Sequence, residues 1–159
     1  MADGPRCAVI TVSTSRYAGS SDADASGDLI ASRLEALPGC IVHRALVPDD
    51  VDTIRTALTE VDADLVVLTG GTGIAASDVT PEAVRPLLQR ELPGMAEAMR
   101  AAGLANTPLA MLSRQLAGVM GNALVLLLPG STSACSDCLD AVWPALPHAL
   151  ELLRQARPG

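Results

Sequence analysis

Lysine is absent from this chain of 159 residues, and all eleven of its basic residues are arginine. This excludes a Schiff-base lysine and the lysine of a Walker-type phosphate loop. Aromatic residues are almost as scarce: one Trp, one Tyr and no Phe leave no platform on which nucleic-acid bases could stack. Because the net charge is −7, the chain also lacks the excess of cations that binds phosphate backbones, and we expect no nucleic-acid partner.

Long apolar segments are missing as well. No run approaches the roughly 20 residues of a membrane helix, and the N-terminal MADGPRCAV lacks the basic patch and apolar stretch of a signal peptide. We therefore expect a cytoplasmic protein with no membrane partner. Apolar residues make up 49% and charged residues 18% of the chain, as in ordinary globular proteins, and its length suits a single domain over residues 1–159.

Histidine and cysteine give little support to hydrolase or zinc chemistry. The two histidines, His43 and His148, have no Ser or Cys partner in a catalytic motif, and no G-x-S-x-G sequence occurs. Of the four cysteines, only Cys135 and Cys138 form a C-x-x-C pair, and no second pair completes a zinc site. We interpret this pair as two small side chains that pack on one face of a helix; a redox or metal pair is the alternative.

The order of the apolar segments predicts an α/β fold. Runs rich in β-branched residues cover residues 7–12, 41–47 and 65–69, and segments with helical spacing separate them. This alternation is typical of a parallel sheet with crossover helices. The sequence LAGVMGNALVLLLPG predicts an added antiparallel hairpin whose second arm, residues 124–128, lies in the centre of the sheet. We predict a single three-layer α/β/α domain with a mostly parallel sheet.

Prolines mark several expected helix boundaries. Thr80 and Pro81 are typical of the N-cap and first residue of a helix. Pro93 and Gly94 are expected to end that helical region, before another short helix that stops at Gly103. The last helix should begin near Ser133, and the prolines of the WPALP sequence should bend or restart it.

A glycine-rich segment, LTGGTGIAASDVTPEAV (residues 68–84), begins with the last two residues of the strand expected at residues 65–69. Gly70, Gly71 and Gly73 allow positive φ angles and a close approach of backbone amides to a ligand. Such a loop at the carboxyl end of a parallel strand forms an anion site, most naturally for phosphate. A tight turn that needs glycine for geometry alone is one alternative. A dinucleotide-binding fingerprint is another, because GTGIAA fits G-x-G-x-x-A, but the expected helix starts several residues too late for it.

Two acidic residues follow expected strand ends, Asp49 in LVPDD and Asp78 in ASDVTP. Each could be a helix cap or a turn residue. However, the carboxyl ends of parallel strands meet at one edge of a sheet, so both carboxylates could face the glycine loop. Mg²⁺ is commonly bound through one or two carboxylates together with substrate phosphates. The pattern therefore favours a magnesium and phosphate site.

Taken together, the segments resemble the molybdopterin adenylyltransferase family, which includes the MogA and MoaB proteins and the G domain of gephyrin. The resemblance rests on eight motifs in order, namely TVSTS, DASGD, LVPDD, LTGGTG, DVTPEA, LPGMAEAMR, TPLAMLSRQLAGVMG and LLPGS. It implies an α/β domain, usually a homotrimer, that transfers AMP from Mg-ATP to the terminal phosphate of molybdopterin. The adenylylated product would pass to a molybdate-insertion protein.

The same resemblance assigns roles to residues. The family's catalytic and magnesium-binding acids correspond to Asp49 and Asp78. The family's ligand-binding positions correspond to Ser13, Thr14, Ser15, Gly70, Gly71, Thr72, Gly73, Ser113, Arg114, Pro129 and Gly130. A phosphate monoester with a second pKa of about 6 is already largely dianionic at neutral pH, so its attacking oxygen needs no general base. Positioning and charge neutralisation suffice, and neither requires lysine or histidine.

Two cations common in relatives are missing here. Ser77 stands where many relatives have Arg before the DVTPEA acid, and STSAC follows LPG where many have Lys. Arg16, Arg85 and Arg114 are candidate substitutes. The alternative hypothesis is a non-catalytic protein of the same fold that binds a pterin or a nucleotide, and the sequence leaves molybdenum and tungsten pathways both open.

Overall fold

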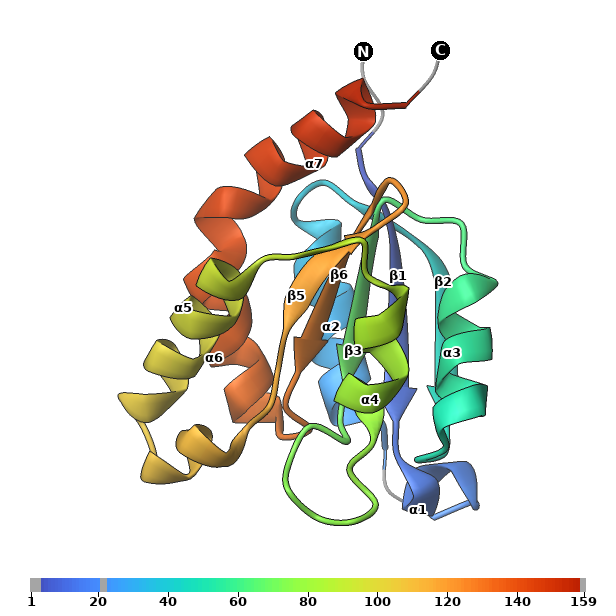
Figure 1. Ribbon diagram of the computed structural model, residues 1–159, viewed down its shortest axis with the longest axis vertical. Helices are drawn as coiled ribbons and strands as arrows, with labels where there is room; N and C mark the ends of the chain where they lie inside the picture. The colour runs from blue at the N-terminus through green and yellow to red at the C-terminus, as the bar shows by residue number, and fades with distance from the viewer. Residues whose placement is uncertain (1–3, 21–22, 158–159) are drawn as a thin grey trace.

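A computed structural model describes residues 4–20 and 23–157 of the chain and shows a six-stranded sheet between two layers of helices (Figure 1). The strands are β1 (Arg6–Val12), β2 (Cys40–Val47), β3 (Leu65–Thr69), β4 (Arg90–Glu91), β5 (Ala117–Met120) and β6 (Ala123–Leu128). Their order is β2-β1-β3-β6-β5-β4. Strands β2, β1, β3 and β6 are parallel, whereas β5 and β4 run antiparallel to their neighbours. The predicted α/β class and mostly parallel sheet are confirmed.

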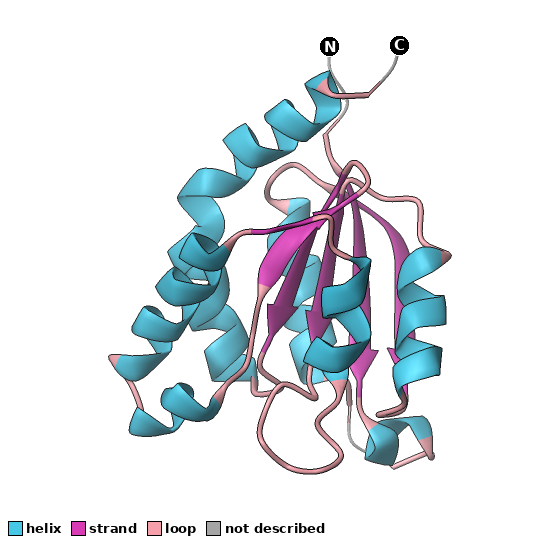
Figure 2. Ribbon diagram, in the orientation of Figure 1, coloured by secondary structure: helices cyan, strands magenta, loops and turns pink. Residues whose placement is uncertain are grey.

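Helices cover both faces of the sheet (Figure 2). They are α1 (Thr14–Tyr17), α2 (Ala25–Glu35), α3 (Val51–Thr59), α4 (Thr80–Val84), α5 (Pro93–Leu104), α6 (Thr132–Val142) and α7 (Leu146–Gln155), with 3-10 turns η1 (Arg85–Leu87), η2 (Pro108–Leu112) and η3 (Trp143–Ala145). Alternate residues of each strand point to opposite faces, which separates two cores. One core packs against α2, α5, α6 and α7, and the other packs against α3 and α4.

The predicted central strands and hairpin are confirmed. Every residue of β3 and β6 is buried, as expected for strands covered on both faces. The β5–β6 turn uses Gly121 with a φ of +60°, a conformation that favours glycine. The chain also bends at η3 between α6 and α7, as its prolines predicted.

Three boundaries differ from the sequence-based expectation. Thr80 is the first residue of α4 and not its N-cap, because its buried hydroxyl donates a hydrogen bond to the carbonyl of Gly70 (2.9 Å). Pro93 begins α5 instead of ending a helical region, which fits the preference of proline for the first helical turn. The short edge strand β4 was not expected, since its two exposed residues carry no apolar pattern. Among the described residues, no helix is long and apolar enough to cross a membrane.

The four parallel strands are paired in a register that brings their carboxyl ends to one level. The four loops that follow them therefore start side by side. Val12 pairs with Val47, Thr11 with Thr69, and Thr69 with Leu128, so all four strands end at one level. The chain leaves β1 towards β2 on one side and later returns to β3 on the other, by way of helices on opposite faces. In such sheets the crevice beyond the strand ends, at the point where the direction changes, is the usual ligand site. This edge lies at the bottom of Figure 1, opposite the two termini.

Candidate functional site at the carboxyl ends of the strands

The glycine loop after β3 presents bare backbone at this edge. Gly70 and Gly71 have φ angles of +99° and +66°. Hydrogen bonds from the hydroxyl of Thr80 to the carbonyl of Gly70 (2.9 Å) and from the amide of Thr80 to that of Gly71 (3.1 Å) fix the loop. Within the described chain, the amides of Gly71, Thr72 and Gly73 donate to no other group. Consecutive amides without a partner, in a turn with positive φ angles, can form a nest for an anion.

Asp49 lies on the β1 side of this loop. Its Oδ2 accepts hydrogen bonds from the hydroxyl (2.7 Å) and the amide (3.2 Å) of Thr14, whose hydroxyl in turn accepts from the amide of Asp49 (3.0 Å). A Cβ added to Gly71 would lie 3.0 Å from Oδ1 of Asp49. The carboxylate is therefore held by one oxygen and directs the other towards the loop.

Asp78 lies at the other end of the loop. Its Oδ2 accepts a hydrogen bond from the amide of Ala75 (3.0 Å), and a Cβ added to Gly73 would lie 2.7 Å from the same oxygen. The structure thus places Asp49 and Asp78 against the same glycine loop, although they are 29 positions apart in the sequence.

This pair of carboxylates fits Mg²⁺ in combination with a substrate. One oxygen of Asp49 and one of Asp78 accept no hydrogen bond from the described residues. Among the residues that the structure describes, no group of three or more His, Cys, Asp or Glu side chains could hold a metal ion by itself. Mg²⁺ keeps several waters and takes substrate phosphates as ligands, so two acids beside an anion nest are sufficient.

The hydroxyl-rich stretch Ser13–Ser15 forms the start of α1 beside Asp49. The amide of Ser13 donates to the carbonyl of Val47 (2.9 Å), and its Oγ caps α1 by accepting from the amide of Arg16 (3.4 Å). Thr14 and Ser15 are exposed at the end of β1. The predicted hydroxyl groups and the predicted acid therefore share one edge.

Ser113 and Arg114 reach the loop from the segment before β5. The amide of Arg114 donates to the carbonyl of Thr72 (2.7 Å), and the hydroxyls of Thr72 and Ser113 are 3.5 Å apart. This main-chain contact places Ser113 next to the glycine loop, 41 residues away in sequence.

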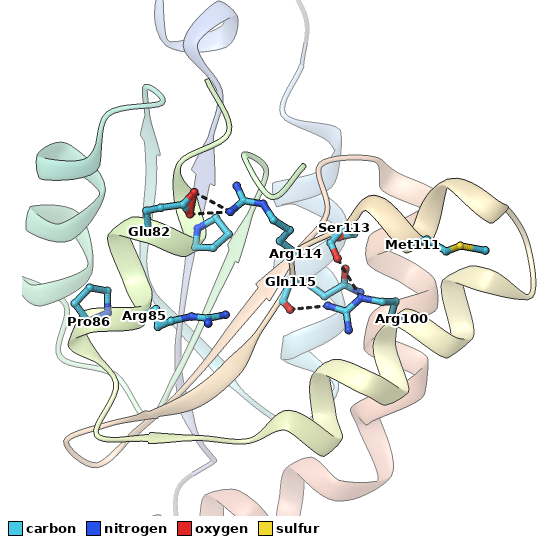
Figure 3. A pocket seen from close by; sticks show the side chains of 9 residues that line it. Glu82, Arg85, Pro86, Arg100, Met111, Ser113, Arg114 and Gln115 are labelled. Carbon is cyan, nitrogen blue, oxygen red and sulfur yellow. Dashed lines mark hydrogen bonds and ion pairs between the residues drawn. The ribbon is translucent and has the colours of Figure 1, made fainter. Parts of the chain in front are cut away.

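The guanidinium of Arg114 forms hydrogen bonds to two carbonyl groups of the segment that carries Asp78. It donates to the carbonyl of Gly73 (Nε, 2.8 Å) and to that of Asp78 (Nη2, 2.8 Å). It also forms an ion pair with Glu82 (2.8 Å), as Figure 3 shows. Arg114 therefore positions the segment that carries Asp78. A direct contact of Arg114 with a ligand stays a prediction.

Pro129 and Gly130 complete the edge. The hydroxyl of Thr69 donates to the carbonyl of Pro129 (2.7 Å), and a Cβ added to Gly130 would lie 3.6 Å from Cα of Gly70. Helix α6 begins directly afterwards, with Ser131 as its N-cap. Its N-terminal amides add positive potential at this edge.

Sequence reasoning missed two residues that shape this edge. Ser26 donates a hydrogen bond to the carbonyl of Gly130 (2.7 Å), and Asp24 accepts from the hydroxyl of Thr11 (2.8 Å) while it caps α2. Both lie in DASGD, a motif that supported the family resemblance but was not assigned to the site. Of the candidate substitutes, Arg16 donates to the carbonyl of Ala23, and Arg85 pairs with an acid of β4 (3.3 Å).

The cysteine pair packs behind the site, where the thiol of Cys135 donates to the carbonyl of Pro129 (3.1 Å), and the two histidines lie outside it. Cys135 and Cys138 are buried in the α6 core, as the packing interpretation predicted. Burial raises the pKa of both thiols, that of Cys138 to about 12, so both are protonated near neutral pH. His43 and His148 are exposed on β2 and α7.

Residues 8–148 match the protein family described as a probable molybdopterin binding domain. This chain belongs to that family. The match covers strands β2 to β6, all but the first two residues of β1, and the whole carboxyl edge described above.

Individual relatives agree with this assignment. Molybdopterin adenylyltransferase of Helicobacter pylori J99 is 44% identical over 115 residues, which cover 70% of this chain and 65% of the relative. The chain thus spans less than two thirds of the length of that relative. Molybdenum cofactor biosynthesis protein B of Staphylococcus carnosus is 38% identical over 93% of this chain and 90% of its own. The crystal structure of the molybdopterin biosynthesis enzyme MoaB of Thermus thermophilus superposes with a TM-score of 0.86 at 43% identity, and the alignment covers 94% of this chain and 96% of that one.

Proposed function

We propose that this protein transfers an adenylyl group from Mg-ATP to the terminal phosphate of molybdopterin during molybdenum cofactor biosynthesis. The observation that carries the proposal is the nest of free amides at Gly71, Thr72 and Gly73, with the carboxylates of Asp49 and Asp78 at its two ends. The name of the Helicobacter pylori relative, molybdopterin adenylyltransferase, supports it.

The chemistry needs few protein groups. An oxygen of the pterin's phosphate attacks the α-phosphorus of ATP, the bond from that phosphorus to the bridging oxygen breaks, and pyrophosphate leaves. The attacking phosphate is already anionic near neutral pH, so no side chain has to remove a proton. Asp49 and Asp78 would hold Mg²⁺, which when bound neutralises charge on the triphosphate.

The residues of the chain bind the phosphate groups of the substrates and hold the two carboxylates in position. The loop amides donate hydrogen bonds to phosphate oxygens and stabilise charge there in the transition state without reorganisation. Thr14 holds Asp49, and Arg114 holds the main chain at Asp78, so both carboxylates are fixed before substrate binds. Arginine suits the second task because its planar donors reach two carbonyl groups at once.

Three further expectations belong to this proposal. The protein would form a homotrimer, and the exposed apolar side chains of Leu109, Met111 and Leu112 on η2 support an assembly surface. A molybdate-insertion protein would receive the product. The cytoplasmic location expected from the N-terminal sequence stays a prediction.

A second function is a pterin- or nucleotide-binding protein without catalysis. The observation that favours it is the exposed Ser77 in the loop before Asp78, where many relatives have a cation. In that case ligand would bind, but no bond to phosphorus would form.

Incubation of the purified protein with molybdopterin, ATP and Mg²⁺ separates the two functions. We expect adenylylated molybdopterin and pyrophosphate in equal amounts, and no product when EDTA removes the metal. Binding of both ligands without either product would establish the second function instead.

A further inference from the structure

Gln115 carries an unusual buried polar group. Its residue is 3% exposed, and its Oε1 is the one buried side-chain nitrogen or oxygen without a hydrogen-bond partner in the described part of the chain. The other end of the amide, Nε2, lies 3.7 Å from Sγ of Cys138. Most buried polar atoms in folded proteins have a partner, so an orphaned acceptor requires an explanation.

The main chain around Gln115 is firmly held. Arg100 donates to the carbonyl of Ser113 (Nε, 3.1 Å) and to that of Gln115 (Nη2, 3.1 Å), as Figure 3 shows. Leu116, which follows Gln115 and directly precedes β5, is buried in the core. These contacts hold the main chain at Gln115, and the side-chain amide is buried there. A partner for Oε1 would therefore have to come from the space beside it.

A cavity beside the site provides the space for such a partner. It has a volume of about 530 Å³ and lies between α5, η2 and α6, with Gln115 in its wall. Ser113, Pro129 and Ser131 line it as well, and these residues belong to the carboxyl edge described above. A ligand with phosphates on the glycine loop could thus extend a ring into this cavity.

The lining indicates the chemical class of that ring. Met99 and Leu109 supply apolar surface, and Asn106 and Asp137 supply polar groups near the entrance, where the Asn106 amide donates to the Asp137 carboxylate (2.7 Å). Mostly apolar walls with a few placed polar groups are typical of sites for planar organic ligands. An unpaired carbonyl oxygen in such a wall accepts a hydrogen bond from an N–H or O–H group, so a ring that pairs with it must carry such a donor.

We propose that Gln115 is a specificity-determining residue whose Oε1 accepts a hydrogen bond from an N–H group of a substrate heterocycle in this cavity. The inference rests on the proposed function, which supplies two such heterocycles: the adenine of ATP and the amino-substituted pterin ring of molybdopterin. Both have the required donor, and the test distinguishes them.

The test compares Gln115→Met with the wild-type protein. Methionine keeps the length and apolar stem of glutamine but removes the acceptor. Gln155→Met, at an exposed position on α7, makes the same chemical change outside the cavity and serves as the control. Dissociation constants for ATP, for purine riboside triphosphate (ATP without its amino group) and for molybdopterin are measured by calorimetry, together with the thermal unfolding midpoint of each protein.

Loss of the hydrogen bond should raise the dissociation constant of one N–H-bearing ligand by about tenfold to a hundredfold. If the partner is adenine, Gln115→Met weakens ATP but leaves purine riboside triphosphate unchanged; if it is the pterin, only molybdopterin is weakened. The unfolding midpoint should stay equal or rise, because the variant no longer buries an unpaired acceptor. Unchanged affinities overturn the proposal, as does an equal loss for all three ligands with a lower midpoint, which would show a merely structural role.

The outcome is separable from that of the proposed function, because binding is measured without turnover. A wild-type protein that forms no adenylylated pterin, but whose ring selectivity depends on Gln115, refutes the proposed function alone. A wild-type protein that binds neither ATP nor molybdopterin refutes both.

Discussion

At the scale of single residues, Arg114 holds together the main chain of the candidate site. Its side chain bonds to the carbonyls of Gly73 and Asp78 and to the carboxylate of Glu82. The two carbonyl contacts fix the ends of the segment that carries the second acid. A lysine could supply the charge of Arg114, but its single nitrogen cannot reproduce the spread of donors from Nε, Nη1 and Nη2 that reaches both carbonyls and Glu82.

This distinction predicts the effect of Arg114→Lys. If Arg114 acts mainly by positioning Asp78, the variant should lose at least about tenfold in the rate of adenylyl transfer, since a charge-assisted hydrogen bond contributes about 1.5–3 kcal/mol. The rate constant for transfer and the dissociation constant for ATP, each measured at two salt concentrations, check this. Near-normal transfer by Arg114→Lys, with an ATP affinity that falls steeply with salt, would show that Arg114 acts as a phosphate-binding charge.

The buried thiols predict how stability depends on pH. Burial raises the pKa of Cys7 and of Cys138 from an ordinary value of 9.0 to about 12. Above pH 9 the unfolded chain therefore releases these protons while the folded chain keeps them, so the free energy of unfolding should fall as pH rises from 9 towards 12. Denaturant unfolding at pH 8, 9, 10 and 11 measures this. The decline should be shallower in Cys138→Ala than in the wild-type protein, and equal slopes would contradict the assignment.

At the scale of secondary structure, the sequence predicts those elements whose side chains are all in the same kind of environment, such as strands that are buried on both faces. β3 and β6 are apolar at every position and lie in the centre of the sheet, and the Gly-Asn turn before β6 sets the hairpin. The two residues of β4 could not be predicted, because their pairing depends on β5 and not on their own side chains. The start of α4 was misplaced for a similar reason: the Thr80 hydroxyl bonds to a carbonyl ten residues away instead of capping the helix.

The glycine loop gives a prediction at this scale. In Gly71→Ala, a non-glycine residue would have to adopt a φ of +66°, and its Cβ would clash with the hydroxyl oxygen of Thr80 and lie 3.0 Å from Oδ1 of Asp49. We expect a loss of about 1–2 kcal/mol in stability from the backbone alone, together with a large loss of adenylyl transfer. Gly94→Ala is the matched control, because its Cβ would meet nothing within 4 Å and alanine favours the α5 helix. Chemical denaturation and the transfer assay compare the two variants; equal effects would mean that the backbone of the loop has no special role.

At the scale of the whole molecule, the site exists only because four parallel strands end at the same level. The sequence supplied the acids and glycines, and the topology of the sheet explains why residues 13–15, 49, 70–73 and 129–130 meet. The contacts of Arg114 and the orphaned oxygen of Gln115 could not be predicted, since both depend on where side chains point after segments far apart in sequence have packed together.

The central claim is that Asp49 and Asp78 act in adenylyl transfer through their carboxylates. Asp50 provides a matched control, because it is adjacent to Asp49 but caps α3, where its Oδ2 accepts from the amide of Thr53 (2.9 Å), and asparagine is an equally good cap. Asp49→Asn, Asp78→Asn and Asp50→Asn should all keep the wild-type fold by circular dichroism.

The decisive measurement is the single-turnover rate of adenylylated molybdopterin formation from Mg-ATP by these three variants. We predict a loss of at least about a hundredfold for Asp49→Asn and Asp78→Asn, the size found when one preorganised charge-stabilising group is removed from an active site. Asp50→Asn should retain the wild-type rate. Near-normal rates for Asp49→Asn and Asp78→Asn, or an equal loss in all three variants, would contradict the account.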